Sequence, residues 1–370
     1  MRFNRFIIAC FLLGYMCCIY SRSAYAQIYP KKDFIISAEG HYGFIMSHRN
    51  NMAHLIKGHI YGGELSYTFR TDGCKPWQQI YKYPEIGLCV LTMYLANPQQ
   101  LGNLGALYPF INLRLNKVSS KVNFNLRLGE GLGYITKRFD RINNHKNNVI
   151  GSHVNGFVNI RLNASTLLAN IWRLNLGVGL SHISNGAAKT PNLGINMATL
   201  NAGIGYVFGN KCIDVRIDTI VPCTKNWKIS VIAISGIKER SVPDGPKYLV
   251  FGLQTNVYKI LNYKNKLGGG IEATYSNATK AEWLNDSIFT KQFVDIIQVG
   301  AKFSYAYVIN KLSFPVDFGV YIYKRQRTNG QFFHRIGVRY MLTKHLIANL
   351  TLLTHWAKAD YFEGGLGYEF

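Results

Sequence analysis

The chain has 370 residues, and only 16% of them are charged, whereas ordinary globular proteins carry roughly 25%. Hydrophobic residues make up 48% and aromatic residues 14%, which is typical of strands that face lipid and end in aromatic girdles. The formal net charge is +23, which predicts an acidic partner or a strongly basic solvated surface.

The N-terminal residues have the pattern of a secretory signal peptide. A short basic region precedes the apolar run 6–20, and Ala24-Tyr25-Ala26 has the small-x-small form of a signal peptidase site. We therefore expect residues 1–26 to be removed. Export argues against nucleic acid as the partner, so phosphorylated lipid in the outer leaflet of a Gram-negative-type outer membrane is the natural counterpart of the basic excess. A basic lumen or loop set without a dedicated ligand would account for the charge equally well.

After residue 26 no run of about 18 apolar residues appears, so we expect no helical membrane spans. Apolar and polar residues alternate instead, most clearly in 121–128, 154–162 and 312–322. Short polar connections near 116–119 and 309–311 contrast with longer ones near 48–57 and 138–151, as in barrels with short periplasmic turns and long outer loops. The pattern predicts an all-β fold, a transmembrane antiparallel up-and-down β-barrel of about 14–16 strands. The alternative, a secreted soluble β-sandwich, is usually shorter than this chain.

The strands fall into two groups along the chain. About eight lie within residues 27–208, and about eight more lie within residues 209–370, after a polar linker. We expect the additional strands to close the same barrel as the first group. Four cysteines remain in the mature chain, and their three possible pairings stay open, with Cys212 and Cys223 the first pair to test because they flank one segment. The other two are Cys74 and Cys89.

The segment 174–208 contains the candidate chemistry. His182 and Ser184 continue the apolar face formed by the even-numbered residues 174–180, so both point outward toward lipid near a strand end. Residues two apart on a strand lie about 6.6 Å apart along it, so His182 can act as the base for Ser184. On the returning strand Asn196 belongs to the same face, where it can orient the imidazole.

The loop between these strands can cap the site. Its backbone N–H groups and the side chains of Asn185 and Asn192 are candidate oxyanion donors. An H-x-S sequence alone is a weak signal, since a His and a Ser at a membrane interface can simply bind lipid headgroups.

The motif His182-Ile183-Ser184-Asn185-Gly186, followed by Pro191-Asn192 and Gly194-Ile195, resembles the lipid A 3-O-deacylase family of outer-membrane barrels, which is related to acyloxyacyl hydrolases. The resemblance implies hydrolysis of the acyl ester at the 3-position of a lipid A glucosamine, without a metal or other cofactor. It assigns His182 as base, Ser184 as nucleophile, and Asn185 and Asn192 as oxyanion support.

Three further residues complete this prediction. Gly186 belongs to the substrate-binding loop, and Lys189 is expected near the lipid A phosphates. The family has a Glu where this chain has Asn196, and an amide can orient an imidazole but cannot stabilise imidazolium by charge. The family barrel corresponds to residues 27–208 only.

The predicted function is therefore an outer-membrane serine esterase acting on lipid A. The alternatives are a non-catalytic pore or structural barrel with a remnant H-x-S-N site, and a lipid-transport or adhesion protein. His355, Glu363 and Glu369 are expected to face the lumen, where they form either a second acid–histidine site or, more simply, a polar lining. No metal-ligand spacing is present, and the sequence leaves the oligomeric state open.

Overall fold

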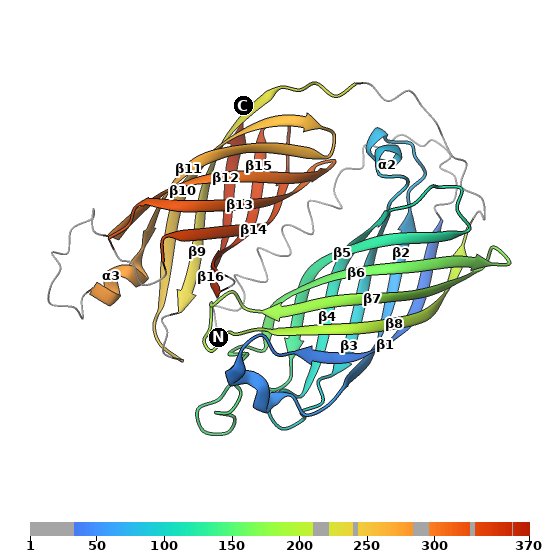
Figure 1. Cartoon of the computed structure of the whole chain (residues 1–370), viewed down its shortest axis with the longest axis horizontal. Coiled ribbons are helices and arrows are strands. Elements are labelled where there is room, and N and C mark those ends of the chain that lie inside the picture. Colours follow the sequence, from blue (N-terminus) through green and yellow to red (C-terminus); the bar gives the residue numbers. More distant parts are fainter. Residues whose placement is uncertain (1–32, 210–221, 240–242, 284–295, 326–329, 357) are drawn as a thin grey trace.

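A computed structural model describes residues 33–209, 222–239, 243–283, 296–325, 330–356 and 358–370. The predicted signal peptide, residues 1–26, lies outside the described residues. The strands form two closed antiparallel barrels that follow one another along the chain (Figure 1). In the part of the chain that the structure describes, no helix is long and apolar enough to cross a membrane.

The first barrel contains eight strands, and each pairs with its neighbours in the chain. β8 closes the barrel by pairing with β1, from Phe34↔Phe208 to Met46↔Asn196. A 3-10 helix, η1 (Asn50–Leu55), lies between β1 and β2, and α2 (Pro76–Ile80) lies between β2 and β3. The strands are β1 (Phe34–Met46), β2 (Ile60–Arg70), β3 (Glu85–Tyr94), β4 (Asn103–Arg114), β5 (Val122–Ile135), β6 (Val154–Leu168), β7 (Trp172–Ser184) and β8 (Ile195–Phe208).

The second barrel also contains eight strands and closes by pairing of β16 with β9. A short helix, α3 (Asn277–Trp283), follows β11. The strands are β9 (Trp227–Glu239), β10 (Lys247–Asn262), β11 (Asn265–Ser276), β12 (Ile297–Ile309), β13 (Leu312–Tyr323), β14 (Phe332–Met341), β15 (Leu346–His355) and β16 (Lys358–Glu369).

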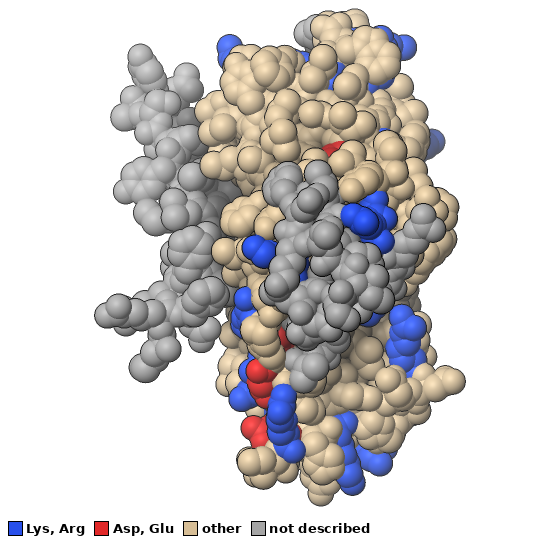
Figure 2. Space-filling model, turned by 90° about the vertical axis from the view of Figure 1, so that its left-hand side faces the viewer, with Lys and Arg blue, Asp and Glu red and all other residues tan. Residues whose placement is uncertain are grey.

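The strands alternate between an exposed, mainly apolar face and a buried face, which is polar in most strands and apolar in β3 and β4. In β7, Leu176 is 63% exposed, whereas Arg173 and Ser181 are buried in the lumen. Lys, Arg, Asp and Glu cover only a small part of the described surface in Figure 2. The predicted all-β transmembrane barrel architecture is therefore confirmed, because side chains two apart in a strand share a face and the outward set is apolar.

The lumen of the first barrel contains an ion-pair cluster beside a cluster of buried hydrophobic side chains. Glu64 accepts hydrogen bonds from Arg127 Nη1 and Arg161 Nη2, both at 2.9 Å, and from the Tyr108 hydroxyl at 3.1 Å. Arg161 also lies 3.4 Å from Glu39. Buried charges need such partners, and an eight-stranded barrel is just wide enough for side chains to fill its interior.

The lumen of the second barrel contains a similar ion-pair cluster. Arg335 contacts both Glu272 and Glu363, and Lys302 Nζ lies 2.8 Å from Asp317 Oδ2. The prediction that Glu363, His355 and Glu369 face the lumen is confirmed. Nε2 of His355 is hydrogen-bonded to the Tyr321 hydroxyl at 3.0 Å. The carboxylate of Glu369 lies 3.4 Å from Nζ of Lys266.

The prediction that residues 209–370 close the same barrel as residues 27–208 is wrong. Eight strands already close on themselves when β8 pairs with β1, which leaves no free edge for a ninth strand. Strand alternation is identical in one sixteen-stranded barrel and in two eight-stranded barrels, so the sequence pattern does not separate them. The polar stretch after Phe208 connects two barrels.

The sequence left the cysteine pairing open, and Cys212, the first candidate partner of Cys223, lies outside the described residues. Cys223 carries a free thiol. Cys89 is a free thiol buried in the first barrel, beside the ion-pair cluster.

The two barrels contact each other at their corresponding ends. Thr190, in the β7–β8 connection, bonds to Glu239 at the end of β9. At the opposite ends, the Tyr81 hydroxyl donates to the Val308 carbonyl, and the rings of Tyr81 and Tyr307 meet edge to face. Both barrels therefore run in the same direction, as two barrels in one membrane must.

Candidate functional site

His182 and Ser184 lie at the end of β7, on its outward face. Nε2 of His182 is 3.0 Å from Oγ of Ser184, which is a hydrogen-bond distance between a base and a hydroxyl. Ser184 is 5% exposed and His182 is half-buried. Both residues have the parity of the exposed leucines of β7, so neither turns into the lumen.

Asn196 lies opposite His182 in the β7–β8 pairing. The register aligns the two residues directly, and Oδ1 of Asn196 is 2.6 Å from Nδ1 of His182. The three side chains thus form a continuous row from hydroxyl to imidazole to amide across two neighbouring strands. This is the geometry of a nucleophile, a base and an orienting group.

His48 extends this row by one residue. It follows β1, and its Nδ1 lies 3.1 Å from Nδ2 of Asn196, while its Nε2 lies 3.0 Å from the carbonyl oxygen of Leu193. His48 is not among the site residues predicted from the sequence. Its even number continues the outward face of β1, but only the closure of β8 onto β1, with Met46 opposite Asn196, brings it to the site.

The connection 185–194 contains two asparagine side chains that differ in their hydrogen bonding. Asn185 Nδ2 donates to Ser152 Oγ at 2.7 Å and to the Lys189 carbonyl at 2.8 Å, so the donors of this side chain are occupied within the loop. Asn192 Oδ1 accepts the backbone N–H of Asn185 at 3.0 Å. Nδ2 of Asn192 is buried and has no hydrogen-bond partner in the described structure. Of the two, Asn192 has a donor to offer to a ligand.

Two glycines make close approaches at the site. Gly194 has φ +75°, and a Cβ there would lie 2.7 Å from Cε1 of His182, so a larger residue would displace the imidazole. Gly186 has φ +59°, and a Cβ there would collide with the ring of Phe362 from β16. The glycines therefore let the loop and the second barrel pack against His182 and the end of β7.

Lys189 has a partner in the second barrel. Its Nζ lies 3.2 Å from Asp244 Oδ1, and Arg141 of the first barrel lies 3.6 Å from the other carboxylate oxygen of Asp244. All three side chains remain partly exposed, so this is a solvent-screened cluster at the membrane surface.

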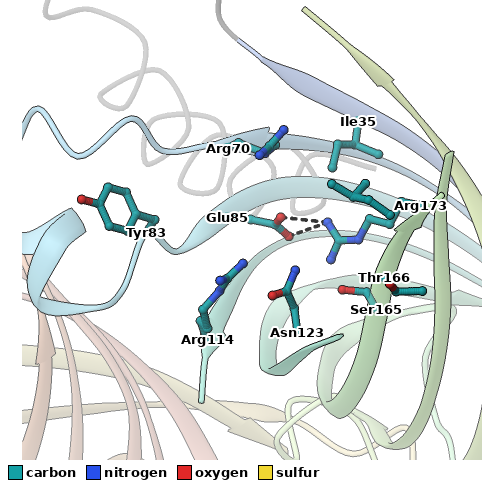
Figure 3. Close-up of a pocket in the computed structure, with 10 residues that line it drawn as sticks. Ile35, Arg70, Tyr83, Glu85, Arg114, Asn123, Ser165, Thr166 and Arg173 are labelled. Atoms are coloured by element: carbon teal, nitrogen blue, oxygen red, sulfur yellow. Dashed lines mark hydrogen bonds and ion pairs between the residues drawn. The ribbon is translucent and has the colours of Figure 1, made fainter. Parts of the chain in front are cut away.

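A pocket also lies at the other end of the first barrel (Figure 3). It contains Arg70 and Arg114 near Glu85, whose two carboxylate oxygens each accept a bond from Arg173 at 2.8 Å. Arg173 belongs to the lumenal face of β7, so this pocket faces away from His182 and Ser184. Across the residues that the structure describes, no group of three or more His, Cys, Asp or Glu side chains is placed to hold a metal ion.

Two protein-family models match the chain. Residues 61–205 match the model described as lipid A 3-O-deacylase (PagL), and residues 226–370 match the model described as acyloxyacyl hydrolase, C-terminal domain. The first match contains Ser184, His182 and Asn196, and the second contains all of β9 to β16. No curated protein matches the chain.

Solved structures with similar folds are outer-membrane barrels. Neisserial surface protein A is 13% identical and has a TM-score of 0.33, and the alignment covers 47% of this chain and 96% of that one. An outer-membrane channel from Pseudomonas putida F1 is 11% identical, with a TM-score of 0.18 and coverage of 94% and 98%. The outer-membrane protein Omp33 of Acinetobacter baumannii is 10% identical, with a TM-score of 0.17 and coverage of 92% and 97%. At these identities and TM-scores, nothing about this chain is argued from the likeness.

Proposed function

Because this chain belongs to the lipid A 3-O-deacylase family of outer-membrane barrels, we propose that it is a serine esterase that removes the 3-O-linked acyl chain of lipid A. Its location is the outer membrane. The observation that carries the proposal is the row Ser184–His182–Asn196, with distances of 3.0 and 2.6 Å, on the lipid-facing side of the barrel.

The end of the barrel at which this row lies supports an outer-leaflet substrate. The long connections 47–59 and 136–153 are at the same end as Ser184, whereas 115–121 and 169–171 are at the opposite end, where only 71–84 is long. Long loops face outward and short turns face the periplasm in bacterial barrels. Lipid A occupies the outer leaflet, so its ester bonds would meet Ser184 from the side.

The proposed reaction follows from the hydrogen-bond geometry. Ser184 Oγ attacks the ester carbonyl carbon while His182 Nε2 takes the hydroxyl proton. The carbonyl oxygen becomes an oxyanion, and Nδ2 of Asn192 is the free donor available to it. When this tetrahedral intermediate collapses, the bond between the carbonyl carbon and the sugar oxygen breaks, and the sugar oxygen leaves with the proton from His182. Water, deprotonated by His182, then attacks the acyl-serine, and the bond to Ser184 Oγ breaks. Oγ takes the proton back from His182, and the fatty acid is released.

The surface around the site suits both parts of lipid A. Exposed Leu180, Leu176 and Val178 extend from His182 toward the membrane interior, where an acyl chain would lie. The connections 47–59, 136–153 and 185–194 contain a single acidic residue, Asp140, which predicts attraction to lipid phosphates. Their basic residues are Arg49, Lys57, Lys137, Arg138, Arg141, Lys146 and Lys189.

The test is lipid A profiling by mass spectrometry in a strain that expresses the full chain. Ser184→Ala and His182→Ala should each abolish loss of the 3-linked acyl chain, because one removes the nucleophile and the other its base. Barrel assembly should be unchanged, as checked by heat-modifiable migration in gels.

Ser181→Ala is the matched control. Ser181 is a serine of the same strand that faces the lumen and bonds to Asn159, so its loss should leave deacylation unchanged. Deacylation that persists in Ser184→Ala would overturn the mechanism, and a different acyl position lost from lipid A would overturn the 3-O assignment.

A further inference from the structure

The direction of each hydrogen bond in the row that ends at Ser184 can be traced from one backbone atom. The carbonyl oxygen of Leu193 can only accept, so Nε2 of His48, 3.0 Å away, carries a proton and donates it. In the neutral ring Nδ1 of His48 is then an acceptor. It therefore accepts from Nδ2 of Asn196, at 3.1 Å.

The directions of the next two hydrogen bonds, from Asn196 to His182 and from His182 to Ser184, follow in the same way. With its amide nitrogen committed to His48, Asn196 must present Oδ1 to His182, and Oδ1 can only accept, so Nδ1 of His182 carries the proton. Nε2 of His182 is then left with a lone pair, which faces the hydroxyl of Ser184. This is the tautomer that a general base requires.

An asparagine alone would not guarantee this outcome. If the amide turned over, Nδ2 would face His182, Nδ1 of His182 would become the acceptor, and Nε2 would carry the proton and lose its function as a base. A carboxylate has no such ambiguity because both of its oxygens accept. An asparagine in this place therefore needs a neighbour that holds its orientation.

We propose that His48 is a positioning residue of the esterase: it holds the Asn196 amide in the one orientation that keeps His182 as the base of Ser184. The inference rests on the proposed function and deepens it. His48 contacts Asn196 and the 185–194 connection rather than the reacting atoms, and it arrives from β1, a third strand beside β8 and β7.

The experiment compares His48→Ala with His48→Asn in the full chain, using deacylation kinetics on lipid A in outer-membrane vesicles. His48→Ala should lower kcat about fivefold to tenfold with little change in KM, the effect expected from losing one hydrogen bond that matters in the transition state. His48→Asn should keep kcat within about twofold, because an amide oxygen on Cγ can replace Nδ1 as the acceptor while it no longer reaches Leu193.

A second comparison uses Asn196→Asp, which is the same size but cannot turn over to present a donor. It should retain activity, and adding His48→Ala to it should cause no further loss. His54→Ala is the matched control, since His54 is another exposed histidine of the same connection that bonds a backbone carbonyl, that of Lys146 at 2.8 Å, and it should behave as the parent.

The outcomes separate the two proposals. An active parent and an inactive Ser184→Ala, together with full activity in His48→Ala, would overturn the positioning proposal and leave the esterase in place. The positioning proposal would also fall if His48→Asn lost as much as His48→Ala, if Asn196→Asp were inactive, or if the loss in His48→Ala persisted beside Asn196→Asp. A parent without deacylation would remove the proposed function itself.

Discussion

The side chain of Asn192 has a defined orientation because its Oδ1 accepts the backbone N–H of Asn185, the residue next to the proposed nucleophile. Its Nδ2 is buried and has no hydrogen-bond partner among the residues that the structure describes, and such an unpaired donor costs about 1–3 kcal/mol unless something binds it. A developing oxyanion would satisfy it, and the bond would be worth more in the transition state than in the ground state.

Asn192→Ala should therefore lower kcat by about 10²–10³ while KM changes little, as for other oxyanion donors. Kinetics on lipid A in vesicles would measure both constants. Asn143→Ala, at an exposed asparagine that bonds Asp140, serves as the control and should match the parent. A loss confined to KM would mean that Asn192 binds the substrate uniformly and has no oxyanion role.

Strand β7 presents two different faces because its residues alternate between the lipid side and the lumen. Its outward even-numbered residues meet lipid and end in His182 and Ser184, while Arg173 on the other face pairs with Glu85 in the lumen. Because period two is a property of any extended chain, the lipid-facing residues and the proposed catalytic residues lie on one continuous face. In the proposed function, this apolar face is the path along which an acyl chain reaches Ser184.

Leu176→Arg should test the membrane placement of this face. Leu176 is 63% exposed in the middle of the apolar stretch, and a charge there should destabilise the folded barrel by about 2–4 kcal/mol. Denaturant unfolding in lipid vesicles would measure this. Leu115→Arg, at a 51% exposed leucine in the connection between β4 and β5, should cost at most about 1 kcal/mol. Equal costs would place β7 outside the hydrocarbon region.

Both barrels of the molecule contain buried charged side chains in their lumens. Arg161 and Arg335 are among the largest fully buried side chains, and each bonds to carboxylates from other strands of its own barrel. Opening a pore would break these pairs and leave unpaired charges in a narrow interior, which is costly. The architecture therefore favours chemistry on the outer surface over conduction.

The second barrel also contacts the loop that carries Asn192. Glu239 accepts from the Thr190 hydroxyl at 2.9 Å and from its backbone N–H, and its own N–H donates to the Ala187 carbonyl at 3.1 Å. Glu239 is 5% exposed, so these bonds are shielded from water. A residue of the second barrel is thus hydrogen-bonded to the connection 185–194 at two residues, Ala187 and Thr190.

Glu239→Ala should lower deacylation about threefold to tenfold, because the loop loses bonds worth roughly 1 kcal/mol each while Ser184 and His182 stay in place. The matched control is Glu369→Ala, a buried carboxylate of the same barrel at its opposite end, paired with Lys266. Initial rates with both assembled variants would check this. Parental activity in Glu239→Ala would show that the loop is held by the first barrel alone.

Local periodicity was enough to predict much of this protein. Alternation along a strand decides which face a side chain joins, so the barrel class and the outward direction of His182 and Ser184 could be predicted from sequence. A single hairpin then brings Asn196 beside His182. These features depend on neighbours in the chain, and extended backbone geometry determines them.

Long-range pairing decided the rest. The closure of β8 on β1 made two barrels where one was expected, and the same closure carried His48 to Asn196. The contact between barrels gave Lys189 and Thr190 partners in Asp244 and Glu239. The alternation of residues along a strand does not encode which strands pair across such distances, because it is the same in one large barrel and in two small ones. Only the pairing of strand edges in three dimensions decides between them.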